Sequence, residues 1–247
     1  MSAHSSALAV IIGRAGSKGL PGKNAMRLPL VPNPQPLVCY SIEHALRATL
    51  VSRVVVSTDG TAIAEAARNR HVEVVRRPPA LASDSASVQA SVQHAVVESG
   101  DRSPVVVILY ANVPVRPAGL IDRAVGMLLE IGADSVQSYC GVGKHHPYWL
   151  ARIDERGCVS ASVPNDVHRR QDLPPLFVPD GGVIAVRREC LMHADDAHPH
   201  AFLGRDRRGL INPEGSVIDI DSALDALVAG AVIAQASDVK EPAGAHR

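Results

Sequence analysis

Short runs of apolar, mainly β-branched residues alternate along the chain with longer stretches whose composition is typical of helices. The runs predict buried strands, because a strand that is covered on both faces is apolar throughout instead of alternating. Strands are expected at 8–12, 53–57, 72–75, 105–109, 135–139, 182–186 and 217–220. Helices are expected at 36–50, 61–70, 84–98, 117–131 and 222–234. Asp84 is expected to cap the third helix, and Pro117 suits the first turn of the fourth.

Strands and helices follow one another in a βαβα rhythm. This rhythm predicts an α/β, Rossmann-like fold, in which a mostly parallel sheet carries helices on both faces. It breaks once, at about 141–179, where the chain is rich in His, Pro and Arg and has no helical period. We interpret this region as an insertion into a single domain that spans 1–247.

Composition and charge exclude several classes of protein. Hydrophobic residues make up 46% of the 247 residues, which is enough for a sizeable core and argues against a disordered chain. The 25 basic and 25 acidic side chains cancel, so neither a nucleic-acid-binding surface nor a basic membrane-binding helix is indicated. No apolar run approaches the ~20 residues of a membrane span, and no signal peptide is evident. We therefore expect a soluble, cytoplasmic protein.

The charges are nevertheless segregated along the chain. No acidic residue precedes Glu43, although that stretch contains Arg14, Lys18, Lys23 and Arg27. Between Arg208 and Lys240 the pattern is reversed, with acidic residues and no Lys or Arg. Two opposed clusters of this kind indicate a site where phosphates and a metal ion meet.

A glycine-rich loop at 13–24 directly follows the first predicted strand. Its sequence is Gly-Arg-Ala-Gly-Ser-Lys-Gly-Leu-Pro-Gly-Lys-Asn. The glycines allow the backbone to approach a ligand closely, and Arg14, Lys18 and Lys23 supply positive charge. Backbone N–H groups and cations at the carboxyl end of a strand form an anion site. The spacing matches neither the Walker A motif nor G-x-G-x-x-G, and the alternative is a surface turn with solvated cations.

The loop resembles the motif A-R-x-x-S-K-G-[IL]-x-x-K-N of the acylneuraminate cytidylyltransferase family, which comprises synthetases of CMP-sialic acid and of other CMP-nonulosonic acids. Gly13 stands where that motif has Ala. Further similarity, in the order of the family's motifs, lies at 54–60, 77–87, 145–147, 170–174 and 219–225. The resemblance extends from about Leu8 to Ala234, and its preserved order makes it specific.

The resemblance implies a transferase that moves CMP from CTP to the anomeric hydroxyl of a nonulosonic, sialic-acid-like keto-acid sugar and releases pyrophosphate. Arg14 and Lys23 would act on the triphosphate as catalytic residues. The positions that match the rest of the nucleotide site are Gly16, Ser17, Lys18, Asn24, Arg77, Ala86 and Ser87. The alternatives are a nucleotidyltransferase for another 3-deoxy-keto acid or a sugar phosphate, and a nucleotide-binding homologue without turnover.

Two carboxylates near the end of the chain suggest a metal site. Asp219 and Asp221 alternate, so on a strand both would face the same side. Such a pair beside phosphates suits Mg²⁺, which is the one cofactor that we expect. Asp221 is also a candidate catalytic base for the attacking hydroxyl. The alternative is that Asp221 only caps the following helix.

The part of the sequence expected to hold the sugar departs from the family pattern. By resemblance, the inserted region would supply a sugar site and the contact of a homodimer, with Arg170 pairing with the sugar's carboxylate and Gln171 beside it. Other departures from the family pattern are Tyr110 in place of Gln, Trp149 in place of Lys, Asp180-Gly181 in place of Asn-Gly, and Ala185 in place of Tyr. We therefore expect CTP as the nucleotide, an acceptor other than N-acetylneuraminate, and a pairing of Asp180 with Arg170.

Overall fold

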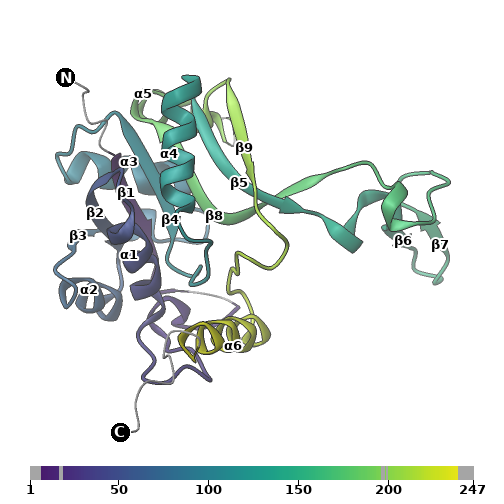
Figure 1. Cartoon of the computed structure of the whole chain (residues 1–247), viewed down its shortest axis with the longest axis horizontal. Helices are drawn as coiled ribbons and strands as arrows, with labels where there is room; N and C mark the ends of the chain where they lie inside the picture. Colours follow the sequence, from purple (N-terminus) through teal and green to yellow (C-terminus); the bar gives the residue numbers. More distant parts are fainter. Residues whose placement is uncertain (1–6, 17–18, 196–197, 199, 239–247) are drawn as a thin grey trace, which may run out of the picture.

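The computed structural model describes residues 7–16, 19–195, 198 and 200–238. Its centre is a seven-stranded sheet with the order β3-β2-β1-β4-β8-β5-β9 (Figure 1). The strands are β1 (Ala7–Ile12), β2 (Val51–Thr58), β3 (Glu73–Arg76), β4 (Val105–Tyr110), β5 (Ser135–Gly141), β8 (Phe177–Arg187) and β9 (Arg207–Ile211). Among the described pairings of this sheet, the two that β8 makes, with β4 and with β5, are antiparallel and the others are parallel. The predicted α/β fold with a mostly parallel sheet is confirmed.

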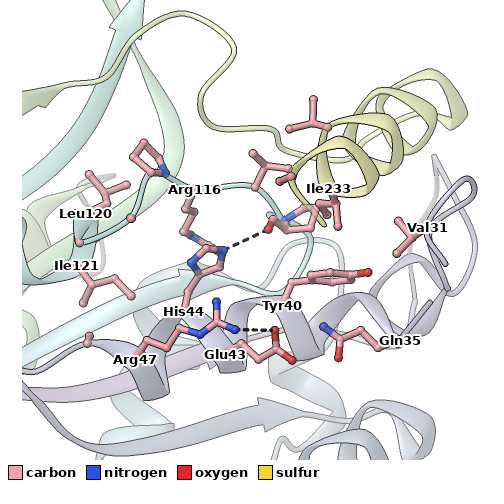
Figure 2. Close-up of a pocket in the computed structure, with 18 of the residues that line it drawn as sticks. Val31, Gln35, Tyr40, Glu43, His44, Arg47, Arg116, Leu120, Ile121 and Ile233 are labelled. Carbon is pink, nitrogen blue, oxygen red and sulfur yellow. Dashed lines mark hydrogen bonds and ion pairs between the residues drawn. The ribbon is translucent and has the colours of Figure 1, made fainter. Parts of the chain in front are cut away.

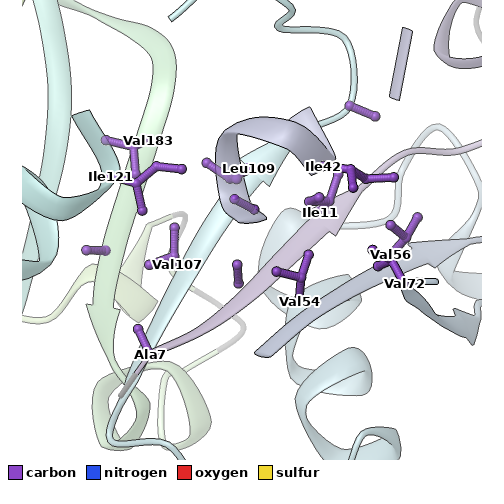
Figure 3. Close-up of a cluster of buried hydrophobic side chains, with 14 of the residues drawn as sticks. Ala7, Ile11, Ile42, Val54, Val56, Val72, Val107, Leu109, Ile121 and Val183 are labelled. Atoms are coloured by element: carbon purple, nitrogen blue, oxygen red, sulfur yellow. The ribbon is translucent and has the colours of Figure 1, made fainter. Parts of the chain in front are cut away.

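Helices cover both faces of the sheet, as the apolar strands require. They are α1 (Leu37–Arg47), α2 (Thr61–Arg68), α3 (Val88–Glu98), α4 (Leu120–Ile131) and α5 (Arg188–Met192), whereas a sixth helix, α6 (Ala223–Asp238), lies outside these layers. Successive side chains of a strand point to opposite faces. Ala9 and Ile11 of β1 pack in the cluster that includes residues of α1, α2 and α4 (Figure 3). Leu8 and Val10 pack in a second cluster, with residues of α3 and α5. This two-sided burial explains why β1 is apolar at every position.

The last predicted strand is wrong. Residues 217–220 form no strand, and only Ile218 makes an isolated bridge, to Val115. The backbone N–H groups of this segment bond instead to carbonyls of the loop between β4 and α4. The strand that does join the sheet is β9, which has two arginines and a glycine in its five residues. An edge strand of this kind has no apolar run to reveal it.

The start of α3 is also corrected. The helix begins at Val88, and the hydroxyl of Ser87 accepts a hydrogen bond from the N–H of Ala90 at 3.0 Å. Ser87 is therefore the capping residue, and Asp84 lies in the turn before it.

Between β5 and β8, residues 142–176 leave the sheet and extend away from it (Figure 1); we call this segment the arm. It contains a two-stranded antiparallel sheet of β6 (Ala151–Ile153) and β7 (Val159–Ala161). Every residue of these two strands is exposed. The arm coincides with the region in which the βαβα pattern breaks, and its apolar side chains are not buried within this chain.

The helix α6 packs outside the main layers, against the loop that precedes α1. Ala226 and Ala229 are buried there, and Gly230 lies so close to the carbonyl oxygen of Pro29 that a side chain would overlap it. Over the described part of the chain, no helix combines the length and apolarity needed to cross a bilayer.

Candidate functional site

A cavity of about 270 Å³ opens at the carboxyl ends of β1 and β4. These two strands are neighbours, and the chain reaches β2 and β3 on one side of β1 before it returns to β4 on the other. Open α/β sheets bind their ligands at such a reversal of strand order. The glycine-rich loop leaves β1 at Gly13, and Asn112 follows the end of β4. The topology therefore places the loop predicted to bind anions at the position where a ligand is expected.

Most of the predicted nucleotide site meets at this cavity, which we call the nucleotide cavity. The residues predicted for the nucleotide that line it are Arg14, Gly16, Lys23, Asn24, Arg77, Ala86 and Ser87, and Tyr110, which was predicted for the sugar, lines it as well. They come from segments that are far apart in the sequence, so their convergence depends on the fold. Ser17 and Lys18 lie outside the described residues.

Contacts from neighbouring segments hold the glycine-rich loop. The N–H of Ala15 donates to Oδ1 of Asp59 at 2.8 Å, and the guanidinium of Arg14 pairs with Asp84. A Cβ on Gly13 would lie 2.7 Å from that of Ala111, which explains why glycine replaces the alanine of the family motif here. Neither Asp59 nor Asp84 was assigned to the functional site from the sequence, although both belong to segments that resemble the family.

Two polar side chains extend into the buried part of the cavity. Arg77 is 8% exposed and donates to the Ser57 hydroxyl at 3.2 Å and to its carbonyl at 2.8 Å. Burial lowers the pKa of Arg77, and Asp59 opposes this effect. The Asn24 amide donates to the Arg14 carbonyl at 2.9 Å. Its Oδ1 is buried and accepts no hydrogen bond from any described residue. The wall of the cavity at Asn24 therefore contains an unsatisfied hydrogen-bond acceptor.

The N-terminus of α3 forms another wall, because Ser87, Val88 and Ser91 line the cavity. The hydroxyl of Ser87 is already used as the cap. The partial positive charge of a helix N-terminus stabilises anions close to it.

Lys23 links the glycine-rich loop to the predicted metal carboxylates. Its Nζ donates to Oδ1 of Asp221 at 2.7 Å and to the carbonyl of Ile220 at 2.8 Å. Only 14% of the Lys23 side chain is exposed, against 77% for that of Asp221. The basic and acidic clusters of the sequence thus meet beside the nucleotide cavity.

Asp221 is not the cap of α6. The Ser222 hydroxyl accepts from the N–H of Asp225 at 3.3 Å, and Oδ2 of Asp225 accepts from the N–H of Ser222 at 2.8 Å. This reciprocal pair is a capping box. The carboxylate of Asp221 is therefore available for another role.

The donor set around Asp219 and Asp221 fits a divalent cation. Burial raises the pKa of Asp219 to about 6, and the like charge of Asp221 adds to this effect. The Lys23 ammonium already occupies a cation's place on Asp221. Within the described ranges no group of three or more His, Cys, Asp or Glu residues is assembled to hold a metal. Mg²⁺ commonly takes one or two carboxylates and completes its shell with substrate phosphates and water, so two carboxylates would be enough to hold it.

The residues predicted for the sugar are divided between two places. A Cβ on Gly181 would lie 3.5 Å from Oδ2 of Asp219 and 3.9 Å from the Tyr110 ring, so this turn adjoins the carboxylates. Asp180 accepts from the N–H of Gly182 at 2.9 Å and from the Asn212 amide at 2.7 Å.

Arg170 lies in the arm and pairs with Glu214 at 3.1 Å. The expected pairing of Asp180 with Arg170 is therefore wrong, because each has another partner. Neither Arg170 nor its neighbour Gln171 lines the nucleotide cavity of this chain.

A larger cavity, of about 780 Å³, lies between α1, the β4–α4 loop and α6 (Figure 2). It contains none of the predicted site residues. His44 of α1 contributes to its wall and bonds through Nε2 to the carbonyl of Pro114 at 3.2 Å. Burial lowers the pKa of His44 to about 4, and the positive charge of Arg116 acts in the same direction. The bond to Pro114 opposes both effects. Volume alone therefore does not identify the site.

The chain is similar to known proteins over more than half of its length. A family model described as cytidylyltransferase matches residues 8–150. The N-acylneuraminate cytidylyltransferase of Streptococcus agalactiae serotype V is 28% identical over 184 residues, which are 74% of this chain and 43% of that protein. The chain thus spans less than half the length of this relative. The CMP-N,N'-diacetyllegionaminic acid synthase of Legionella pneumophila is 28% identical over 228 residues, covering 88% of this chain and 92% of that protein.

The fold is similar to that of a solved CMP:2-keto-3-deoxy-manno-octonic acid synthetase in complex with CTP. The TM-score is 0.71 at 16% identity, and the match covers 94% of this chain and 100% of the solved one. This likeness supports the mixed, mostly parallel seven-stranded fold.

Proposed function

Since the chain belongs to the cytidylyltransferase family, we propose that it transfers CMP from CTP to the anomeric hydroxyl of a nonulosonic acid and releases pyrophosphate. The observation that carries the proposal is the meeting of Arg14 and Lys23 with Asn24 and Arg77 at one cavity. The first two residues suit a triphosphate and the last two suit a base. The relatives named above act, by their names, on acid sugars of this class.

The triphosphate would bind where backbone N–H groups and cations converge. Arg14 would exchange Asp84 for a phosphate oxygen, and Lys23 would move from Asp221 to the α-phosphate. Hydrogen-bond donors aimed at developing charge typically contribute a factor of ~10²–10³ to turnover. The N-terminus of α3 adds a positive potential on the other side of the cavity.

The reaction is an in-line displacement at the α-phosphorus. The anomeric oxygen of the sugar forms the new P–O bond, and the bond from the α-phosphorus to the bridging oxygen of pyrophosphate breaks. Asp221, which is exposed and not used as a cap, accepts the hydroxyl proton. Mg²⁺ held by Asp219 and Asp221 would neutralise charge on the phosphate oxygens.

The cytosine would lie against Asn24 and Arg77. Its N4 amino group is a donor, and Oδ1 of Asn24 is a buried acceptor that no described residue satisfies. Its O2 and N3 are acceptors, which suit the guanidinium of Arg77. Uracil presents a carbonyl in place of the amino group, so this arrangement favours CTP over UTP.

The arm supports a homodimer in which a second copy completes the sugar site. Its exposed apolar side chains include Trp149 (37% exposed), Ile153 (71%) and Val159 (68%). A second copy of the chain would cover them, since large exposed apolar patches commonly mark interfaces. Arg170 would then reach the carboxylate of a sugar bound to the second copy, and not a ligand in the cavity of its own chain.

Pyrophosphate release tests the proposal directly. Each of CTP, UTP and GTP is combined with Mg²⁺ and a panel of 2-keto acid sugars that includes N-acetylneuraminate, a legionaminic acid and 2-keto-3-deoxy-octonate. We expect release with CTP and at least one nonulosonic acid. Turnover that is faster with GTP than with CTP would overturn the assignment of the nucleotide.

A pair of neighbouring arginines provides a matched test of base recognition. Arg77→Met should raise the KM for CTP about tenfold or more, because a buried donor to the base is lost. Arg76→Met changes an exposed side chain next to it and should leave KM within about twofold. Equal effects of the two substitutions would show that Arg77 does not contact the base.

A further inference from the structure

Asn112 lines the nucleotide cavity and contacts Asp219 of the carboxylate pair, although no motif singled it out. It follows β4 by two residues and is one of the residues that line the cavity. Its amide donates to Oδ1 of Asp219 and, at 3.2 Å, to the carbonyl of Ile220. Its own backbone carbonyl accepts from the N–H of Ile220 at 3.0 Å. Both hydrogens of the amide are thus used on the segment that contains the carboxylates.

We propose that Asn112 is a positioning residue, which fixes the carboxylate of Asp219 so that it can bind a divalent cation. The inference rests on the proposed function, since it assigns a role within the same site. The reason for such a device lies in the backbone. Residues 217–220 form no strand, so no sheet ladder sets the direction of the Asp219 side chain. The loop after β4 performs this task instead.

The chemistry of an amide suits this role better than that of a cation. Asn112 orients Oδ1 of Asp219 without neutralising the carboxylate, whereas Lys or Arg would compete with the metal for the charge. Oδ2 of Asp219 accepts no hydrogen bond within the described part of the chain and lies 3.5 Å from where a Gly181 side chain would begin. One oxygen is therefore held while the other stays available as a ligand. Partners of this kind typically change metal affinity by ~10–100-fold.

Mn²⁺ binding to the full chain, followed by electron paramagnetic resonance without nucleotide, tests the inference. Asn112→Ala should raise the Kd for Mn²⁺ by ~10–100-fold. Its Kd for CTP in EDTA should stay within about threefold of wild type, because a role confined to the metal leaves the base and phosphate contacts in place. The matched control is Asn212→Ala, which removes the same type of bond from Asp180 and should leave the Kd for Mn²⁺ unchanged.

The outcomes separate this inference from the proposed function. If Asn112→Ala binds Mn²⁺ as wild type does, or if wild type binds none, the positioning role is wrong even when CTP turnover is observed. If Mn²⁺ binding weakens but no nucleotide is turned over, the role stands and the function falls. Should Asn112→Ala fail to fold, Asn112→Ser is measured instead. Its single hydroxyl donor should still weaken Mn²⁺ binding about threefold or more, and an unchanged Kd would refute the role.

Discussion

Two glycines within helices should respond in opposite directions to the same substitution. A Cβ on Gly230 of α6 would overlap the carbonyl oxygen of Pro29, whereas a Cβ on Gly126 of α4 meets only Leu50, at 3.9 Å. Inside a helix, alanine is more favourable than glycine by ~1 kcal/mol of folding free energy. A forced contact costs ~1–3 kcal/mol, and the value should lie at the upper end here because a backbone oxygen cannot rotate away. We therefore expect the free energy of unfolding to fall by about 2 kcal/mol in Gly230→Ala and to rise by up to about 1 kcal/mol in Gly126→Ala.

Urea unfolding of the two variants beside wild type measures these free energies. A loss of ~2 kcal/mol corresponds to a fall in Tm of roughly 5 °C for a chain of this size. The capping box that begins α6 holds the segment after Asp221, so Gly230→Ala should also lower turnover. If Gly230→Ala proves as stable as Gly126→Ala, the close packing of α6 on Pro29 is refuted.

Three further predictions have defined outcomes. Arg116 is buried and donates to the carbonyls of Tyr110 and Gly182, so Arg116→Met should cost ~3–5 kcal/mol in urea unfolding, whereas the exposed Arg47→Met should cost under ~1 kcal/mol. His44, with its pKa lowered from 6.5 to about 4, stabilises the fold above pH ~6.5 and loses that contribution as pH falls toward 4. The free energy of unfolding of wild type should therefore fall by ~2–3 kcal/mol more between these two pH values than that of His44→Gln. Unfolding measured across this pH range checks the difference. Lys23→Met should lower kcat for pyrophosphate release by ~10²–10³.

The sequence pattern predicted the central sheet well because buried strands must be apolar. The runs that became β1, β2 and β4 are apolar where both faces are covered, and no other structure of that length suits them. The edge strand β9 was not predicted from the sequence, because its exposed positions tolerate arginine and glycine. The antiparallel direction of β8 was not predicted either, since a buried strand has the same composition in either direction.

The candidate site was predictable only as far as its motifs reach. The glycine-rich loop and the segment around Arg77 carry residue types that have few other uses together, and the fold brings them to one cavity. Asn112 had no such signal, because a single amide after a strand is common and its importance depends on a carboxylate 107 positions away. The partner of Asp180 was likewise set by tertiary contacts, with Asn212 supplied by the loop after β9.

The ion pairs of the nucleotide cavity bear on how a chain with no net charge would hold the proposed triphosphate. Arg14 pairs with Asp84 and Lys23 with Asp221, so each cation proposed to bind phosphate is already neutralised by a carboxylate from a distant segment. A nucleotide that enters alone would take the cations and leave both carboxylates exposed to its own negative charge. A nucleotide that enters with a divalent cation would exchange one set of ion pairs for another, because under the proposed function the metal replaces Lys23 on Asp221. The proposed site would therefore favour the metal complex of the nucleotide over the free nucleotide.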